Sequence, residues 1–265
     1  MNKDSDNARP LASKEHWDEW WASGPVRSLP FNPLRRNFRD LHSLFLRTLP
    51  RLERTRFLEI GCYPGGFLWY FSRYFGYAVC GIEYIDWCCR ETRRLLEACG
   101  VQGEIIQADI FDYEQPAEDR LWDVVASFGF LEHFQDSRAV LKKHLELLKP
   151  GGYLVLTVPN HQALYGKILE WAAPELYKIH HILSLEQIVD ALRGAGEVEI
   201  VEEGYYGRLG LGHTGIYLRA KETNPFISQM ARALVFGLET AGLILPRSRL
   251  LSPMIAVIAR KKPGI

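Results

Sequence analysis

The chain has 265 residues, of which 47% are hydrophobic and 24% are charged, so it can bury a sizeable core as one domain, or as one domain with a lid. Its 32 basic and 32 acidic residues cancel, which disfavours the nucleic acids and anionic membranes that a basic excess would attract. The local cluster of Arg35, Arg36 and Arg39 is interpreted as a solvated helix face.

The five cysteines all fall within one stretch of the chain: Cys62, Cys80, Cys88, Cys89 and Cys99. An odd count without a Cys-x-x-Cys pair predicts neither a disulfide framework nor a zinc site, and we expect no metal site. Buried free thiols are typical of a reducing compartment, so we expect a cytoplasmic protein.

Neither end of the chain predicts a membrane segment. The first ten residues, MNKDSDNARP, contain no apolar run of the kind that a signal peptide needs. The most hydrophobic window, 226–245, is interrupted by Gln229, Arg232 and Glu239, a pattern that a spanning helix rarely tolerates. We therefore expect no transmembrane segment, and we disfavour peripheral membrane contact.

Residues 1–50 are predicted to form an N-terminal helical cap, with the first ten or so residues disordered. The segment KEHWDEWWASG has a helical pattern that places Trp17, Trp20 and Trp21 on one face. A proline-rich connection then leads to a second helix at about 34–49, which Pro50 closes. The tryptophan helix is expected either to close over a site as a lid or to pack against the edge of a sheet.

Residues 51–265 are predicted to form an α/β domain with a doubly wound, mainly parallel sheet of seven strands. The apolar runs RFLEIG, AVCGIEY, GEIIQAD, WDVVASFG and YLVLTVPN alternate with helical patterns at about 66–75, 87–99 and 136–148. Runs of this kind are typical of parallel strands that are buried on both faces. The alternation predicts right-handed crossovers between neighbouring strands.

The second half of this domain is less regular. An insert at 161–183, rich in histidine and aromatic residues, precedes a helix that Ser184 is expected to cap. The segments EVEIVEEGYY and MIAVIARK are predicted to be the sixth and seventh strands. Between them, an amphipathic helix at about 226–244 could extend a pocket for a lipid-like ligand or form a dimer face, but we interpret it as part of the core.

The strongest functional signal is the sequence FLEIGCYPGGF at 57–67. A buried strand ends in Glu59, and Gly61 begins a glycine-containing loop that leads into a helix. Ligands bind at this edge of a parallel sheet. The loop lacks the G-x-G-x-x-G pattern that places a pyrophosphate on a helix N-terminus. Glu59 would repel a diphosphate but can pair with an ammonium group.

Two further acidic residues end the next two predicted strands. Glu83, in CGIEYID, can accept both hydroxyl protons of a ribose, and Asp109, in IIQADIFD, can read the amino group of an adenine. One acid at the end of a strand generally faces water. Three successive strands that end in Glu59, Glu83 and Asp109 favour a nucleoside-binding site.

With these motifs the chain resembles the class I S-adenosylmethionine-dependent methyltransferases. LEIGCYPGG resembles the first motif of that family, IEYID the ribose motif, QADIFD the adenine motif, and WDVVASFGFLEHFQD and LLKPGGYLVLTVPN the motifs that follow. LEHFQD is similar to a string seen in the small-molecule branch, which includes quinone-biosynthesis and sugar methyltransferases. The resemblance implies S-adenosylmethionine as cofactor, S-adenosylhomocysteine as product, and binding by Glu59, Gly61, Cys62, Gly65, Gly66, Glu83, Tyr84, Asp109, Ile110, Ser127 and Phe128.

One position departs from the family pattern. Tyr63 replaces the middle glycine of the usual Gly-x-Gly-x-Gly, and Pro64 follows it. Tyrosine disfavours positive φ, and a following proline favours an extended conformation. The loop is therefore expected to take a different path near the methionine end of the cofactor.

Histidines are the candidate general bases for a hydroxyl acceptor. His133 follows the fourth strand, and His180 and His181 lie in the insert; each has the alternative of a purely structural role. His161, Tyr205, Tyr206 and His213 could line the same pocket.

The expected function is direct in-line methyl transfer to a small molecule, on oxygen. The alternatives are a methyltransferase for protein or nucleic acid, or a non-catalytic binding protein. An Asn/Asp-Pro-Pro-Tyr/Phe motif, which resembling enzymes use on bases, is absent from the fourth strand. Nucleic acid is not expected as a partner, and monomer and homodimer are both left open.

Overall fold

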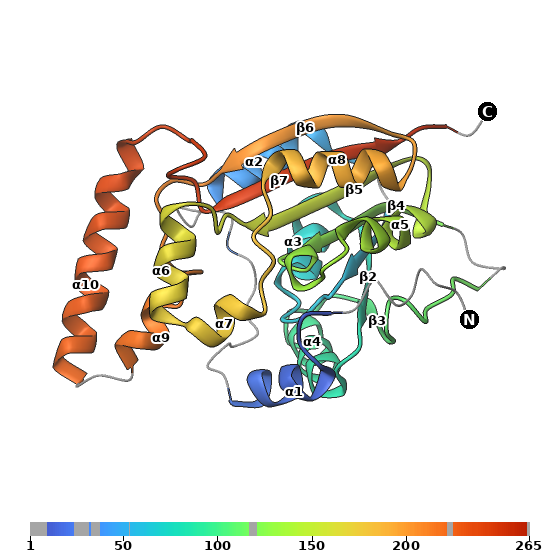
Figure 1. The fold of residues 1–265 in the computed structure, drawn as a ribbon. Helices are drawn as coiled ribbons and strands as arrows, with labels where there is room; N and C mark the ends of the chain where they lie inside the picture. The colour runs from blue at the N-terminus through green and yellow to red at the C-terminus, as the bar shows by residue number, and fades with distance from the viewer. Residues whose placement is uncertain are drawn as a thin grey trace.

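The computed structural model describes residues 10–23, 32, 38–52, 54–116, 121–221 and 225–263. A seven-stranded sheet in the order β3-β2-β1-β4-β5-β7-β6 runs through the molecule (Figure 1). Strands β1 to β5 are parallel to one another, whereas β7 runs antiparallel to both β5 and β6. The predicted doubly wound sheet is confirmed. Residues 1–9, Arg35 and Arg36 lie outside the described residues.

The elements follow the predicted alternation closely. The strands are β1 (Arg56–Ile60), β2 (Ala78–Glu83), β3 (Gly103–Gln107), β4 (Trp122–Phe128), β5 (Leu148–Pro159), β6 (Val198–Tyr206) and β7 (Met254–Lys261). The crossover helices are α3 (Gly66–Phe75), α4 (Asp86–Ala98), α5 (Ser137–Leu147) and α8 (Leu185–Ala195). Ser184 caps α8 as expected, because its hydroxyl accepts a hydrogen bond from the Gln187 backbone N–H.

Both faces of the central strands are buried, because successive side chains of each strand point to opposite sides and helices cover each side. Phe57 of β1 packs with the face covered by α2 (Arg39–Thr48) and α3, whereas Leu58 and Ile60 pack with the face covered by α5 and α8. This explains why β1 has no polar side chain in its interior except Glu59.

The strand order places β1 at the point where the winding of the sheet reverses. The chain runs outward from β1 through β2 to β3, then returns to begin β4 on the other side of β1. The connections after β1 and β4 therefore leave the sheet in opposite directions, which opens a crevice at the carboxyl ends of the strands. Glu59 and Glu83 lie at this edge.

Helix α1 (Lys14–Ser23) packs beside the crevice. Its Trp17 is buried together with Ile85 and Cys88 at the start of α4, and with Ile179 from the second half of the chain. The tryptophans therefore contact the sheet edge on the side where the crevice opens. The interpretation of this helix as a moving lid stays a prediction.

The position of helix α10 differs from the prediction. The segment 226–244 was interpreted as core, but α10 (Pro225–Ala241) projects at one end of the molecule and buries only Val235 among its large apolar side chains (Figure 1). The helix belongs to an insertion between β6 and β7, and it packs on α9 (Ile216–Lys221) rather than on the sheet.

The predicted insert at 161–183 is also helical, with α6 (Leu164–Ala172) and α7 (Pro174–Lys178). No described helix is long and apolar enough to span a bilayer.

We predict that Gly81→Ala destabilises the protein by ~1–3 kcal/mol, because an added methyl group would overpack the core. The alanine Cβ would lie 2.7 Å from the Cβ of Cys62 and 3.1 Å from Leu68. Urea denaturation measures the change. Gly237→Ala in α10 is the control, because no atom lies within 4 Å of its added Cβ; there alanine is expected to be neutral or to stabilise the helix by up to ~1 kcal/mol. Equal stability of Gly81→Ala and the parent would contradict the packing described here.

Candidate active site

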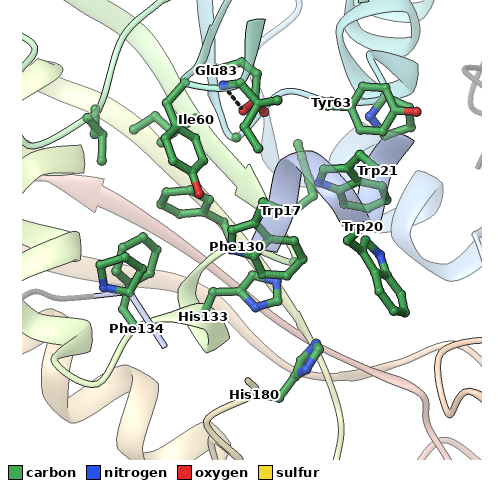
Figure 2. A pocket seen from close by; sticks show the side chains of 18 of the residues that line it. Trp17, Trp20, Trp21, Ile60, Tyr63, Glu83, Phe130, His133, Phe134 and His180 are labelled. Atoms are coloured by element: carbon green, nitrogen blue, oxygen red, sulfur yellow. Dashed lines mark hydrogen bonds between the residues drawn. The ribbon is translucent and has the colours of Figure 1, made fainter. Parts of the chain in front are cut away.

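A cavity of about 660 Å³ opens at the carboxyl ends of β1, β2, β3 and β4. Figure 2 shows that Glu83, Ile60 and Tyr63 lie on one side of it, with His133 and His180 on the other and Trp17 and Phe130 between them. The volume lies within the range of small-molecule sites, roughly 300–1,000 Å³. The wall also includes residues from far along the chain: Leu176, Gly212, His213, Gly215, Tyr217 and Leu218.

Two buried carboxyl groups lie at one side of the site: Glu83 lines the cavity, and Glu59 is buried outside the lining. Glu59 is 3% exposed and Glu83 is 8% exposed. Burial, and then the charge of Glu83, raises the pKa of Glu59 well above its usual range, and burial also raises the pKa of Glu83. Oε1 of Glu83 accepts a hydrogen bond from the Ile85 backbone N–H at 3.0 Å, but Oε2 of Glu59 has no partner among the described residues. Unsatisfied buried acceptors of this kind fit a ligand that brings donors and positive charge.

The loop after β1 turns sharply above this pair. Gly61 and Gly65 have φ of 70° and 84°, which side chains with a Cβ rarely adopt. A Cβ on Gly61 would overlap the ring of Phe130, and one on Gly65 would lie 2.9 Å from Thr92. The prediction that glycines make this turn is confirmed.

Tyr63 lies between the two glycines; its backbone hydrogen-bonds to Glu83, and its ring contacts aromatic residues. Its ring centroid lies 5.0 Å from that of Trp21 in α1 and 5.5 Å from that of Trp87 in α4. The residue that departs from the family pattern thus joins the loop to the tryptophan helix. Its peptide bond with Pro64 is cis.

The predicted cofactor-binding residues divide into two groups. Those that line the cavity are Gly61, Glu83, Tyr84, Asp109, Ile110 and Phe128, whereas Glu59, Cys62, Gly65, Gly66 and Ser127 lie behind its wall. Cys62 packs against Gly81, and Gly65 caps α3. The ring of Phe128 is stacked on Phe67 at 3.7 Å between centroids. The roles of these residues toward the cofactor stay predictions.

The candidate bases separate in the same way. His133 and His180 line the cavity, with ring centroids 4.7 Å apart. His181 does not line it; this residue belongs to a second hollow with Asp136, Arg138 and Gln187. Its backbone N–H donates to the carbonyl of Glu132 at 2.6 Å. The structure therefore brings His133 and His180 together and directs His181 elsewhere.

Two further histidines extend this pair into a row of four rings. His161 lies 5.1 Å from His180, and His213 lies 5.2 Å from His161, between ring centroids. Burial lowers the pKa of His133 to about 3 and that of His213 to about 4, and it also lowers the pKa of His180. All these rings are therefore neutral near pH 7, and their nitrogens can accept protons or bind a metal.

Backbone carbonyls hold the rings of the central pair. Nδ1 of His133 lies 3.3 Å from the carbonyl of Ile179, and Nδ1 of His180 lies 2.6 Å from the carbonyl of Leu176. Because a carbonyl can only accept, Nδ1 carries the proton in each of these two contacts, and the backbone of Gly129 also hydrogen-bonds to the His133 ring. Nε2 of His180 therefore keeps its lone pair for a ligand of the cavity, whereas Nε2 of His133 has an oxygen of Glu132 3.9 Å away.

Glu132 completes a group that the sequence analysis did not identify. It is fully buried, burial raises its pKa to about 8, and one of its oxygens lies 3.9 Å from Nε2 of His133. One ligand atom each of Glu132, His133 and His180 lie within 4.8 Å of one another. The group can relay a proton, and it has the donor types that bind a divalent cation. No spacing signal links 132–133 to 180, because the contact depends on the path of α7.

Comparisons with known proteins identify the family. A model described as a methyltransferase domain matches residues 34–198. A ubiquinone biosynthesis O-methyltransferase of Xanthomonas euvesicatoria is 31% identical over 147 residues, which cover 54% of this chain and 57% of that relative. The enzyme of the same description from Nitrosomonas europaea is 27% identical over 241 residues, covering 84% and 96%. The chain thus spans little more than half the length of the first of these relatives.

A solved structure agrees in fold. The S-adenosylmethionine-dependent methyltransferase of Thiobacillus denitrificans, in complex with S-adenosylhomocysteine, has a TM-score of 0.59 and 19% identity, and the match covers 95% of this chain and 99% of that one. The chain therefore has a doubly wound α/β fold with an acidic crevice at the carboxyl ends of its parallel strands. The chain belongs to the methyltransferase-domain family, and the predicted class and its cofactor, S-adenosylmethionine, are confirmed.

We predict that His161→Phe makes the fold less sensitive to acid. Burial lowers the pKa of His161 from 6.5 to about 2, so between these values the unfolded chain takes up a proton that the folded chain does not. The parent should lose stability as pH falls below 6.5, by about 1.4 kcal/mol per pH unit from this residue. Phenylalanine keeps the ring and removes the buried nitrogen Nδ1, which lacks a partner.

Thermal unfolding of both proteins at pH 8 and pH 5 measures the difference, and the variant should gain on the parent at pH 5. Tyr165→Phe is the matched control, because it loses the hydrogen bond to the Leu251 carbonyl but no group that titrates in this range. A parallel pH dependence of parent and His161→Phe would contradict the interpretation.

Proposed function

We propose that this protein transfers the methyl group of S-adenosylmethionine to an oxygen of a small acceptor with an apolar body, such as a hydroxylated aromatic ring or quinol. The observation that carries the proposal is the arrangement of the cavity. The carboxyl group of Glu83 lines one side, with that of Glu59 buried behind it, and the neutral histidines His133 and His180 line the other. The names of the relatives, which describe O-methylation in ubiquinone biosynthesis, support the same acceptor class.

Residues on the acidic side would hold the cofactor. Glu83 lines the cavity and can accept hydrogen bonds from both ribose hydroxyls, and Tyr84 and Ile110 flank the position expected for the adenine. Glu59 lies beneath the glycine loop, where its unpaired oxygen can accept from the ammonium group. When bound, the cofactor supplies a methyl group that its sulfonium makes electrophilic, so the protein needs only to orient the acceptor and exclude water.

The histidine side would receive the acceptor hydroxyl. As the acceptor oxygen forms its bond to the methyl carbon, the carbon–sulfur bond breaks and the hydroxyl proton passes to Nε2 of His133 or His180. One oxygen of Glu132, whose pKa burial raises to about 8, lies 3.9 Å from Nε2 of His133, and in its ionised form this carboxyl would stabilise the imidazolium. Trp17, with its ring centroid 4.6 Å from that of His133, covers this side and excludes water.

One alternative for this step has a specific observation behind it. Glu132, His133 and His180 could bind a divalent cation that lowers the pKa of the acceptor hydroxyl instead of removing its proton directly. A chelator separates the two. Activity that survives exhaustive treatment with a chelator favours the histidines as base, and activity restored by added metal favours the cation.

We predict that Glu83→Gln weakens S-adenosylhomocysteine binding by about 10- to 100-fold, because hydrogen bonds to a charged acceptor are worth ~1.5–3 kcal/mol. Isothermal titration calorimetry measures the affinity. Glu104→Gln, an exposed carboxyl on β3, removes the same charge and should bind like the parent. Equal affinity of Glu83→Gln and the parent would place the ribose elsewhere.

We predict that His133→Gln lowers kcat by about 100- to 10,000-fold against a catechol or hydroxyquinol acceptor, the usual contribution of a general base. Its affinity for S-adenosylhomocysteine should stay close to that of the parent, since His133 lies on the acceptor side. His181→Gln, outside the cavity, is the control and should retain activity. Unchanged kcat in His133→Gln would exclude this residue as the base, and binding without transfer to any acceptor would favour the non-catalytic alternative.

A further inference from the structure

Exposed apolar side chains gather at one end of the molecule. Of the sixteen large apolar side chains exposed among the described residues, twelve belong to α6, α10 and the segment 243–250. Phe226 is 69% exposed, Leu234 is 65% exposed and Ile244 is 89% exposed. A concentration of this kind on one face generally marks an interaction surface, whereas single exposed apolar residues do not.

Helix α10 carries most of this surface. Its inner side packs on α9 through Val235, and Glu239 also turns inward, where its carboxylate accepts the Leu211 backbone N–H at 2.7 Å. The other sides carry Ile227, Met230 and Leu234 at helical spacing. No carboxylate of α10 therefore faces outward, and Figure 1 shows the helix at the edge of the molecule, beyond α6 and α9.

Four arginines border the apolar residues, and two of them, Arg247 and Arg249, contribute to lowering the pKa of Glu202 and of Glu186. Arg232 lies on α10, Arg247 and Arg249 follow it, and Arg219 on α9 lies over the ring of Trp171 in α6 at 5.1 Å. Among the described residues none of these four forms an ion pair, although Arg247 also lies over the ring of Tyr206. The net charge of the whole chain is zero, so it does not reveal this local group of positive charges.

An exposed apolar helix face bordered by arginines favours a lipid bilayer as its binding partner. A bilayer accepts an apolar helix face lying in its interface, and anionic headgroups complement bordering arginines. A second copy of the same face would instead bring further arginines and no carboxylate from α10 to meet them. We propose that α10, with the segment 243–250, docks this protein on the surface of an anionic lipid bilayer, although the sequence alone disfavoured membrane contact. Since no described helix can span a bilayer, the contact is interfacial.

Docking in this orientation would bring the cavity near the bilayer. Helix α9, on which α10 packs, supplies Tyr217 and Leu218 to the cavity wall. The membrane face and the acceptor side of the site are therefore separated by one helix. Delivery of an acceptor from the bilayer rests on the proposed function, but docking itself does not.

Co-sedimentation of the full chain with vesicles tests the proposal. The parent should bind vesicles of phosphatidylcholine mixed equally with phosphatidylglycerol more strongly than vesicles of phosphatidylcholine alone. Met230→Glu combined with Leu234→Glu should weaken binding about tenfold or more, because charge replaces apolar contact at the interface. Arg232→Gln combined with Arg249→Gln should reduce the preference for the anionic vesicles.

The matched control is Leu52→Glu combined with Val201→Glu, which makes the same change of charge on exposed apolar residues outside the docking face. This control should bind vesicles nearly as the parent does, and calorimetry with S-adenosylhomocysteine should show that every variant is folded. Absence of binding to both vesicle types, or equal binding of parent and the Met230/Leu234 variant, would overturn the proposal. A dimer in sedimentation velocity that the same variant converts to monomers would overturn it too, and would assign the face to a second copy. Loss of methyl transfer with vesicle binding intact would contradict only the proposed function.

Discussion

Two carboxyl groups are buried at the ends of β1 and β2, and the ligand that the site can bind depends on them. Placing Glu59 and Glu83 side by side in a buried position is unfavourable while both are ionised, and the raised pKa values of both express that cost. Parallel neighbours β1 and β2 carry the two side chains to the same edge of the sheet, and the winding reverses at β1 to leave room above them. A ligand with an ammonium group and ribose hydroxyls satisfies both groups at once.

The opposite side of the cavity has the complementary chemistry. Burial keeps its histidines neutral, and the backbone carbonyls of Ile179 and Leu176 hold the rings of His133 and His180 through Nδ1. One cavity therefore combines a side that attracts a cationic cofactor with a side that can accept a proton without carrying charge beforehand. The α9–α10 insertion closes the acceptor side and projects an apolar helix beyond it.

The sequence predicted what depends on local pattern. Buried apolar runs identified the parallel strands, and the acids that follow them identified the cofactor side, because the ends of parallel strands meet at one edge. The two glycines of the loop were required as expected, whereas the ring of Tyr63 took up contacts with Trp21 and Trp87 that no local pattern indicates. Amphipathic spacing in α10 was wrongly interpreted as core, since spacing reports an apolar face but not whether anything covers it.

The acceptor side depends on tertiary contacts. His180 and His181 are adjacent in sequence, yet only His180 lines the cavity, because the backbone after α7 directs the two side chains to different hollows. Glu132 meets His180 only through that same path. Tyr217 and Leu218 lie in a segment without a motif, and only the packing of α9 brings them to the wall.

The most direct test of the central claim is the proton balance of S-adenosylhomocysteine binding, measured by calorimetry at pH 6 in buffers of different ionisation enthalpy. If the ammonium group binds Glu59, whose pKa burial raises, binding should favour the ionised carboxyl and release protons, and Glu59→Gln should reduce the release. Binding with no proton release from the parent protein, or release unchanged in Glu59→Gln, would contradict the account of the buried carboxyl pair as the cofactor's receptor.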